Sequence, residues 1–211
     1  MKVYCLSDNE MDENTYIVKR ADDITIIDPG FNYSLIDKYL KENELKPTRI
    51  LLTHGHIDHF CDTDKIYKNF GDIPLYISKF DYNFLFDESI NCAKDLGLKG
   101  ILKEKKNVIK VDDKDNIDGF IFHLTPGHTP GSACIEIENL LFTGDTLFRG
   151  TIGRSDLPLG SMSQLNESIK YIATSFSKNT IILPGHYSKS TLIDELKNNP
   201  YLKDIKKEKK W

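Results

Sequence analysis

The chain contains few cysteines, and their spacing is unsuited to a cross-linked fold. Its four cysteines, Cys5, Cys61, Cys92 and Cys134, lie far apart and form no C-x-x-C pair. Disulfide-stapled secreted domains and zinc fingers depend on closely spaced cysteines, so both classes are disfavoured. Scattered cysteines of this kind fit reduced thiols and predict a cytoplasmic protein.

Long apolar runs are also missing. No stretch of about 18 apolar residues occurs, so the sequence predicts no membrane-spanning helix. The opening residues Met1 to Cys5 lack the apolar stretch and the small-residue cleavage site of a secretory signal. We therefore expect no membrane partner and a cytoplasmic location.

Charge of one sign is not concentrated along the chain. Lys and Arg together number 28 and Asp and Glu 32, which gives a net charge of −4. The lysine-rich block at 206–210 resembles a solvated tail, and a shorter one at 103–106 a polar loop. Because a nucleic-acid-binding surface needs a basic face, we expect no nucleic-acid partner.

The residues that are present predict a single folded α/β domain spanning 1–211. Hydrophobic residues make up 39% of the 211 residues, enough for one sizeable core. β-Branched and aromatic runs predict strands at 3–6, 15–18, 24–27, 49–52, 75–77, 108–111, 120–124, 133–137, 140–143 and 180–183. Helical spacing predicts helices at 34–43, with Ser34 as its N-cap, and at 61–70, 81–86, 163–175 and 190–197. Two strand-rich halves fit two sheets packed face to face with helices outside.

The segment Thr53-His54-Gly55-His56-Ile57-Asp58-His59 is the most informative part of the sequence. It follows an almost wholly apolar strand and precedes a predicted helix. In an extended loop, His54, His56 and Asp58 share a side while His59 points elsewhere, so one loop can serve two adjacent metal ions. Imidazole and carboxylate groups are ligands for zinc, iron or manganese.

Three further candidate ligands lie in glycine turns that directly follow predicted strands. They are His128, Asp145 and His186. Loops at strand ends are where rigid scaffolds place functional groups. The other histidine, His123, lies within an apolar strand and is interpreted as structural, pointing toward solvent or a helix.

The ligand pattern resembles the metallo-β-lactamase superfamily in order and spacing over nearly the whole chain. Within it, Gly144-Asp145-Thr146-Leu147-Phe148 and Gly153-Arg154-Ser155-Asp156-Leu157-Pro158 are similar to short bacterial hydrolases related to glyoxalase II, the hydroxyacylglutathione hydrolases. The resemblance implies a four-layer αβ/βα sandwich, made of two mixed β-sheets flanked by helices, with a dinuclear metal centre.

The resemblance also implies a role for each ligand. His54, His56 and His128 would hold the first of two divalent metal ions, and Asp58, His59 and His186 the second. Asp145 would bridge the two ions, which we expect to be zinc, with iron or manganese as alternatives. Asp28 resembles the supporting acidic residue of the family.

The activity implied is hydrolysis of a small-molecule thioester such as S-lactoylglutathione. Asp58 would orient the attacking hydroxide and take its proton, and Arg154 would either steer an acidic substrate or fix its own loop through an ion pair. Full-length glyoxalase II carries a helical C-terminal domain that supplies much of its glutathione pocket. Only 25 residues follow His186 here, which leaves the thiol half of the substrate open.

Two other functions fit the same resemblance. A persulfide dioxygenase uses the scaffold with one iron, although that family usually has Gly-Asp-Ala where this chain has Gly144-Asp145-Thr146. A non-catalytic metal or redox module is the second alternative, and the presence of all seven ligands argues against it. A β-lactamase is disfavoured because the sequence shows no signal peptide. A nuclease of this scaffold is disfavoured because its added domain and basic face are missing.

Overall fold

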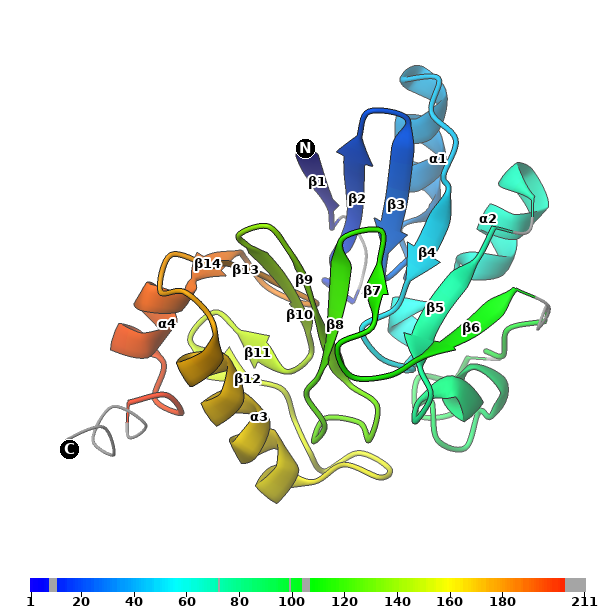
Figure 1. The fold of residues 1–211 in the computed structure, drawn as a ribbon. Coiled ribbons are helices and arrows are strands. Elements are labelled where there is room, and N and C mark those ends of the chain that lie inside the picture. The colour runs from blue at the N-terminus through cyan, green and yellow to red at the C-terminus, as the bar shows by residue number, and fades with distance from the viewer. Residues whose placement is uncertain (8–10, 72, 99, 104–106, 204–211) are drawn as a thin grey trace. The chain divides into compact units, whose positions relative to one another are not determined.

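A computed structural model describes residues 1–7, 11–71, 73–98, 100–103 and 107–203. By their internal contacts these residues divide into an N-terminal unit, Met1–Val111, and a C-terminal unit that begins at Asp112. Each unit contains one six-stranded sheet with helices packed against it (Figure 1). The lysine-rich block at 206–210 and residues 104–106 of the shorter one lie outside the described residues.

The sheet of the N-terminal unit follows the order of the chain, β1-β2-β3-β4-β5-β6. Its strands are β1 (Lys2–Leu6), β2 (Thr15–Arg20), β3 (Asp23–Ile27), β4 (Arg49–Leu51), β5 (Leu75–Ser78) and β6 (Val108–Val111). Strands β1, β2 and β3 pair antiparallel, and from β3 to β6 each strand is parallel to the next. The sheet is therefore mixed, and its parallel half reads as short apolar runs because it is buried.

Two helices and two 3₁₀ helices complete the described part of this unit. They are α1 (Tyr33–Glu42), α2 (Thr63–Phe70), η1 (Ile57–His59) and η2 (Tyr82–Phe86). The apolar faces of α1 and α2, with Ile36, Leu40 and Ile66, pack on sheet residues such as Ile26 and Ile50. This core fixes the loop that joins β4 to η1.

The sheet of the C-terminal unit has the order β14-β13-β10-β9-β8-β7. Its strands are β7 (Asn116–Ile117), β8 (Phe120–Leu124), β9 (Ala133–Ile137), β10 (Leu140–Gly144), β13 (Ile181–Pro184) and β14 (Ser190–Thr191). Strands β10 and β13 are parallel and the other neighbours are antiparallel, so this sheet is also mixed. A hairpin of β11 (Leu147–Phe148) and β12 (Thr151–Ile152) follows β10.

Helices α3 (Met162–Ser175) and α4 (Leu192–Asn198) cover this sheet with Leu165, Ile169 and Leu192 packed near Leu141 and Ile182. Ser161 caps α3 by accepting a hydrogen bond from the backbone N–H of Gln164. The longest helix of the described residues has 14 residues, and none of these helices is long and apolar enough to cross a membrane.

Most predicted elements are found near their expected positions, and the differences are local. The first helix begins at Tyr33, so the prediction of Ser34 as its N-cap is wrong. Asn32 holds the cap position, and its side chain donates instead to the carbonyl oxygen of Leu6 at 3.1 Å. The predicted helix at 81–86 is the 3₁₀ helix η2, and 190–191 form β14 before α4 begins at Leu192.

Candidate metal centre

The N-terminal unit places its histidines next to a buried carboxylate because of strand order. Strands β3 and β4 are parallel neighbours, with Ile27 paired to Leu51. Asp28 follows β3 and Thr53 follows β4 at the same sheet edge. The carboxylate of Asp28 accepts hydrogen bonds from the Thr53 backbone N–H at 2.8 Å and from the Thr53 hydroxyl at 2.6 Å.

These bonds decide which nitrogen of His54 can bind a metal. The single hydroxyl proton of Thr53 goes to Asp28, so the Thr53 oxygen accepts the proton of His54 Nδ1, 3.1 Å away. Nε2 of His54 then carries a lone pair. An outer hydrogen bond of this kind fixes the tautomer and ring orientation of a metal-binding histidine.

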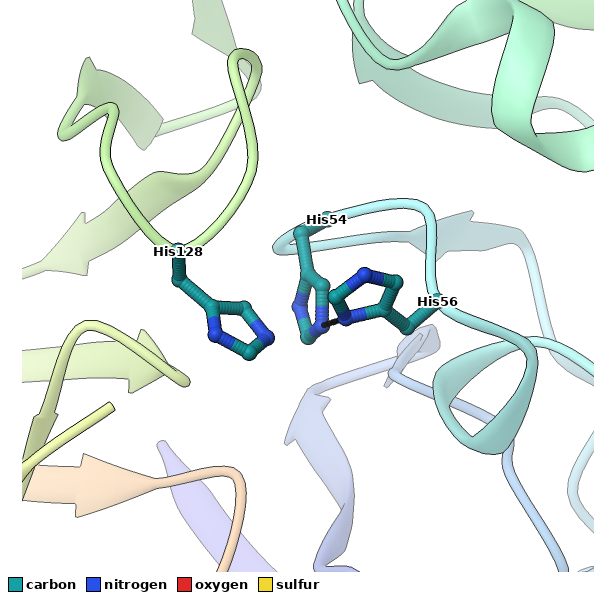
Figure 2. A group of neighbouring side chains, drawn as sticks. All are labelled: His54, His56 and His128. Atoms are coloured by element: carbon teal, nitrogen blue, oxygen red, sulfur yellow. Dashed lines mark hydrogen bonds between the residues drawn. The ribbon is translucent and has the colours of Figure 1, made fainter. Parts of the chain in front are cut away.

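His56 turns its ring toward His54. Nδ1 of His56 lies 3.2 Å from Nε2 of His54, and the two rings meet nearly at right angles (Figure 2). Because Nε2 of His54 is an acceptor, this approach is favourable only with a proton or a shared cation between the nitrogens. Both rings are buried.

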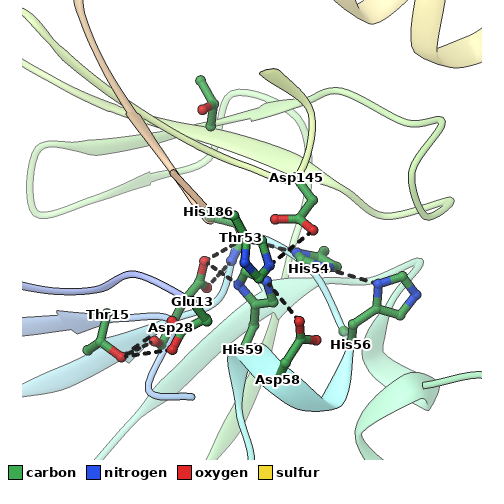
Figure 3. Close-up of polar contacts among 12 residues, drawn as sticks. Glu13, Thr15, Asp28, Thr53, His54, His56, Asp58, His59, Asp145 and His186 are labelled. Carbon is green, nitrogen blue, oxygen red and sulfur yellow. Dashed lines mark hydrogen bonds and ion pairs between the residues drawn. The ribbon is translucent and has the colours of Figure 1, made fainter. Parts of the chain in front are cut away.

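His59 is held by the same carboxylate as Thr53. Its Nδ1 lies 3.1 Å from Oδ2 of Asp28, and the ring is fully buried (Figure 3). Because a carboxylate accepts, Nδ1 donates the proton and Nε2 has the lone pair. Oδ2 of Asp58 lies 3.8 Å from Nε2 of His59, so a carboxylate and an imidazole of η1 face each other.

Gly55 permits the close packing of this loop. A Cβ at Gly55 would lie 2.4 Å from the Cβ of Phe84, and the Gly55 N–H donates to Asp81 at 2.9 Å. Only a residue without a side chain lets the backbone approach η2 so closely. The spacing of His54 and His56 therefore depends on this glycine.

Glu13 belongs to the same network and was missed by the sequence analysis. Its side chain is fully buried, and its Oε2 accepts a hydrogen bond from Asn32 Nδ2 at 2.9 Å (Figure 3). Burial raises the pKa of Glu13 well above its usual range; His59 opposes this rise, and the negative charges of Asp28 and Asp58 add to it. A glutamate directly before the buried Asn14 and Thr15 is the only sequence signal for it.

The C-terminal unit places its three candidate ligands at one edge of its sheet. His128 follows β8, Asp145 follows β10 and His186 follows β13. Strands β10 and β13 are parallel, and the Gly185 N–H donates to the Gly144 carbonyl at 2.8 Å. The carboxyl ends of these strands therefore carry Asp145 and His186 side by side.

Asp145 lies between the two candidate ligand histidines of this unit. Its Oδ2 is 3.5 Å from Nε2 of His128 and 3.6 Å from Nε2 of His186. Nδ1 of His128 donates to the backbone carbonyl of Arg154 at 2.7 Å, which leaves the lone pair on Nε2, facing Asp145. An anionic oxygen and a nitrogen lone pair at this distance are complementary to a cation.

Arg154 is fixed by a neighbouring carboxylate. Its guanidinium donates to both oxygens of Asp156, at 2.7 and 2.9 Å, and both side chains are largely exposed. This hydrogen bonding lowers the pKa of Asp156. The loop-fixing ion pair that the sequence left open for Arg154 is present.

The donor set fits divalent transition metals. All seven predicted ligands belong to groups of histidine and carboxylate side chains that could hold a metal ion. In His54, His59 and His128 an outer hydrogen bond at Nδ1 reserves Nε2 for this purpose. Neutral imidazole with carboxylate is the ligand chemistry of zinc, iron and manganese sites.

His123 and Cys61 belong to none of the described groups that could hold a metal ion. His123 is almost fully buried and faces Tyr171 and Phe176 at α3, so it points toward a helix. Cys61 is a free thiol next to α2, and burial raises its pKa above the usual range. A thiol of raised pKa is a poor metal ligand and a poor nucleophile.

The chain belongs to the metallo-β-lactamase superfamily, whose family model matches residues 8–186. It is 36% identical over 196 residues to a Bacillus subtilis protein named "Probable metallo-hydrolase YqgX", covering 90% of this chain and 92% of the relative. It is 34% identical over 189 residues to "Hydroxyacylglutathione hydrolase GloC" of Haemophilus influenzae, covering 84% and 86%. These findings support a metallo-hydrolase with a histidine-rich metal site.

Solved structures show the same fold. The BLEG-1 B3 metallo-β-lactamase aligns with a TM-score of 0.87 and 31% identity, over 95% of this chain and 99% of that chain. TTHA1623, solved in a di-iron-bound form, aligns with a TM-score of 0.86 and 30% identity, over 94% and 100%. The predicted fold class, with two mixed sheets flanked by helices, is thereby confirmed.

Proposed function

We propose that the protein is a binuclear metal-dependent hydrolase that cleaves small hydroxyacyl thioesters such as S-lactoylglutathione. The observation that carries the proposal is the outer hydrogen bonding of the histidines. Asp28, through Thr53 and directly, and the Arg154 carbonyl direct the Nε2 lone pairs of His54, His59 and His128 to ligand roles. Outer hydrogen bonds that fix the tautomer of several neighbouring histidines are typical of a metal centre and not of an ordinary polar loop.

The ligands divide between two ions in this proposal, within one domain that spans 1–211. His54, His56 and His128 would hold the first ion, and Asp58, His59 and His186 the second. Asp145 would serve both ions, since its Oδ2 faces a histidine of each group. Zinc is the ion we expect; the di-iron form of TTHA1623 makes iron the principal alternative.

Two divalent ions, when bound, supply a water of lowered pKa and positive charge for the carbonyl oxygen of the substrate. Asp58 would orient that water and accept its proton, since its carboxylate is partly exposed and faces His59. Asp28 keeps the ring of His59 in place during the reaction. The leaving group is a thiolate, which needs no strong general acid.

The choice of substrate rests on the relative named hydroxyacylglutathione hydrolase and on the charge near His128. Arg154 has an exposed guanidinium, and its backbone carbonyl accepts a hydrogen bond from His128. Carboxylates on the thiol part of the thioester substrate would compete with Asp156 for this guanidinium. Arg154 is therefore our candidate for contacting the carboxylates of the substrate.

Metal content and thioester cleavage, measured on the same purified sample, test the proposal. We expect two ions per chain by mass spectrometry and turnover of S-lactoylglutathione. The His56→Ala and Asp145→Asn variants should lose turnover by at least about 10²-fold with the fold retained. Glu167→Gln, which changes an exposed carboxylate on α3, is the matched control and should keep full turnover.

One iron per chain, with oxygen uptake on glutathione persulfide and no thioester cleavage, would replace this proposal with the persulfide dioxygenase. Wild-type turnover in Asp145→Asn would remove Asp145 from the centre.

A further inference from the structure

A second cluster of titratable side chains lies in the C-terminal unit, away from the metal ligands. It joins Lys114, in the turn before β7, to His123 on β8, Glu136 on β9 and Tyr171 on α3. His123 connects all of them. The proposed hydrolysis uses none of these residues.

The hydrogen bonds of His123 establish where its proton lies. Nε2 is 2.7 Å from Oε2 of Glu136, and because a carboxylate accepts, Nε2 donates. Nδ1 then carries the lone pair and accepts from Nζ of Lys114 at 2.6 Å. An amine, an imidazole and a carboxylate thus form a relay in the order that activates a nucleophile: nucleophile, base and orienting acid.

Nδ1 of His123 faces the amine of Lys114 as a hydrogen-bond acceptor. Burial lowers the pKa of His123; the hydrogen bond to Glu136 opposes this, the charge of Lys114 reinforces it and that of Asp113 opposes it. The ring is therefore neutral before it accepts a proton, and Glu136 stabilises the imidazolium that forms. The hydroxyl of Tyr171 lies 2.8 Å from Nδ1 and faces the same point from α3.

Lys114 is both accessible and held in place. The residue is exposed, and its backbone has a positive φ of 67° that is pinned by a 2.7 Å hydrogen bond from its N–H to the Phe122 carbonyl. Its Nζ lies 4.7 Å from the centre of the Tyr171 ring and donates to the Tyr171 hydroxyl. A mobile surface lysine lacks this orientation.

Beside His123 is a hollow of about 220 Å³ whose lining includes Glu136, Tyr171 and Phe176 and is otherwise polar, with Glu138, Asn139 and Asn179 among its residues. The ring of Phe176 meets that of His123 edge-on at 4.9 Å and gives the hollow an apolar wall. It has room for the short acyl chain of a small ester or thioester.

We propose that Lys114 is an acyl-accepting site, with His123 as its base and Glu136 as the residue that positions that base. Lys114 passes one proton to Nδ1 of His123, and the neutral amine attacks the carbonyl carbon of a small acyl thioester. The N–C bond forms and the C–S bond breaks. The nitrogen loses its second proton to the departing thiolate, which leaves as a thiol, and His123 returns its proton to water. The product is an amide on Lys114.

Site-resolved mass spectrometry of the metal-loaded protein tests this inference. The protein is incubated at about pH 7.5 with excess acetyl thioester of N-acetylcysteamine, and acetylation is followed at Lys114 and at Lys178, an exposed lysine of the same unit. We expect Lys114 to react at least about tenfold faster than Lys178, which is a small rate effect for general-base catalysis. The ratio within one sample is independent of any hydrolysis of the donor at the metal centre.

Variants separate the relay from simple exposure. His123→Gln and Glu136→Gln should each bring the Lys114 rate to within about twofold of Lys178, and Tyr171→Phe should retain most of it. Glu136 is partly exposed, so Glu136→Gln tests the relay even if His123→Gln unfolds. Equal rates at Lys114 and Lys178 in the wild type, an unchanged ratio in Glu136→Gln, or acetylation of Tyr171 instead would each overturn the inference.

Discussion

The hydroxyl of Thr53 donates a 2.6 Å hydrogen bond to the carboxylate of Asp28 and thereby controls the tautomer of the next residue. Because its proton is used in this way, its oxygen can only accept from Nδ1 of His54. Thr53 thus fixes the tautomer of its neighbour, the candidate ligand His54, without any metal.

Replacing Thr53 by valine should weaken metal binding and stability together. The Asp28 carboxylate stays buried with one bond fewer, which costs about 1–3 kcal/mol in the free energy of unfolding. The affinity for the metal at His54 should fall about 10- to 100-fold, as expected when an outer hydrogen bond to a ligand is lost. Competition with a chromophoric chelator and thermal unfolding measure the two effects. Thr53→Ser keeps the hydroxyl, so an equal loss in that variant would contradict the explanation.

Gly153 should tolerate no side chain. A Cβ there would lie 1.7 Å from the Asp145 carbonyl oxygen and 3.4 Å from Nδ1 of His128. Gly153→Ala should therefore displace two ligands, destabilise the protein by about 3 kcal/mol and abolish turnover.

Gly150→Ala is the matched control for that variant. Gly150 has a positive φ of 77° and nothing near its Cβ position, so alanine there should cost only about 1 kcal/mol and leave turnover intact. Denaturant unfolding and metal content compare the two. A loss in Gly153→Ala that is no larger than the loss in Gly150→Ala would contradict the role of the contact with Asp145.

Asp23 should make stability depend on pH in acid. Burial alone would raise the pKa of Asp23, but hydrogen bonds from Arg49, Thr48 and Arg20 outweigh it and lower the pKa. A depressed pKa stabilises the folded state above the unfolded value of about 3.9, and the gain is lost as the pH falls through the folded value.

Asp23→Asn should accordingly cost about 1–2 kcal/mol at neutral pH and progressively less as the pH falls through the folded pKa of Asp23. Asp37→Asn, which removes a surface pairing with Lys41, should cost under about 0.5 kcal/mol throughout. Urea unfolding across the pH range gives both values. A cost for Asp23→Asn that does not change with pH would contradict the linkage.

Removing metal should lower the thermal midpoint. Ligand at about 100 times its dissociation constant stabilises the folded state by about 2.7 kcal/mol, which corresponds to roughly 5–10 °C for a chain of this size. Adding zinc back to the chelated protein should restore the midpoint. Calorimetry with His56→Ala, which should recover less than the wild type, shows whether the gain comes from the proposed ligands.

Sequence patterns predicted the strands well because their apolar runs are short, bounded by turns and buried. They also located the candidate ligands, since His54, His56 and Asp145 follow such strands directly. Patterns were weaker where short-range preference competed with packing. Asn32, and not Ser34, is the N-cap residue of α1, and its side chain binds Leu6 and Glu13 instead of capping the helix.

The sequence by itself determined which residue types stand at the ends of the strands, because hydrophobic periodicity and glycine turns are local properties of the chain. Only the tertiary structure decided which nitrogen of each histidine bears its proton, because Asp28 and Arg154 reach His59 and His128 across 31 and 26 residues. The same holds for the burial of Glu13 and the relay from Lys114 to Glu136. Hydrogen bonds between distant residues depend on strand order and close packing, and no local pattern encodes them.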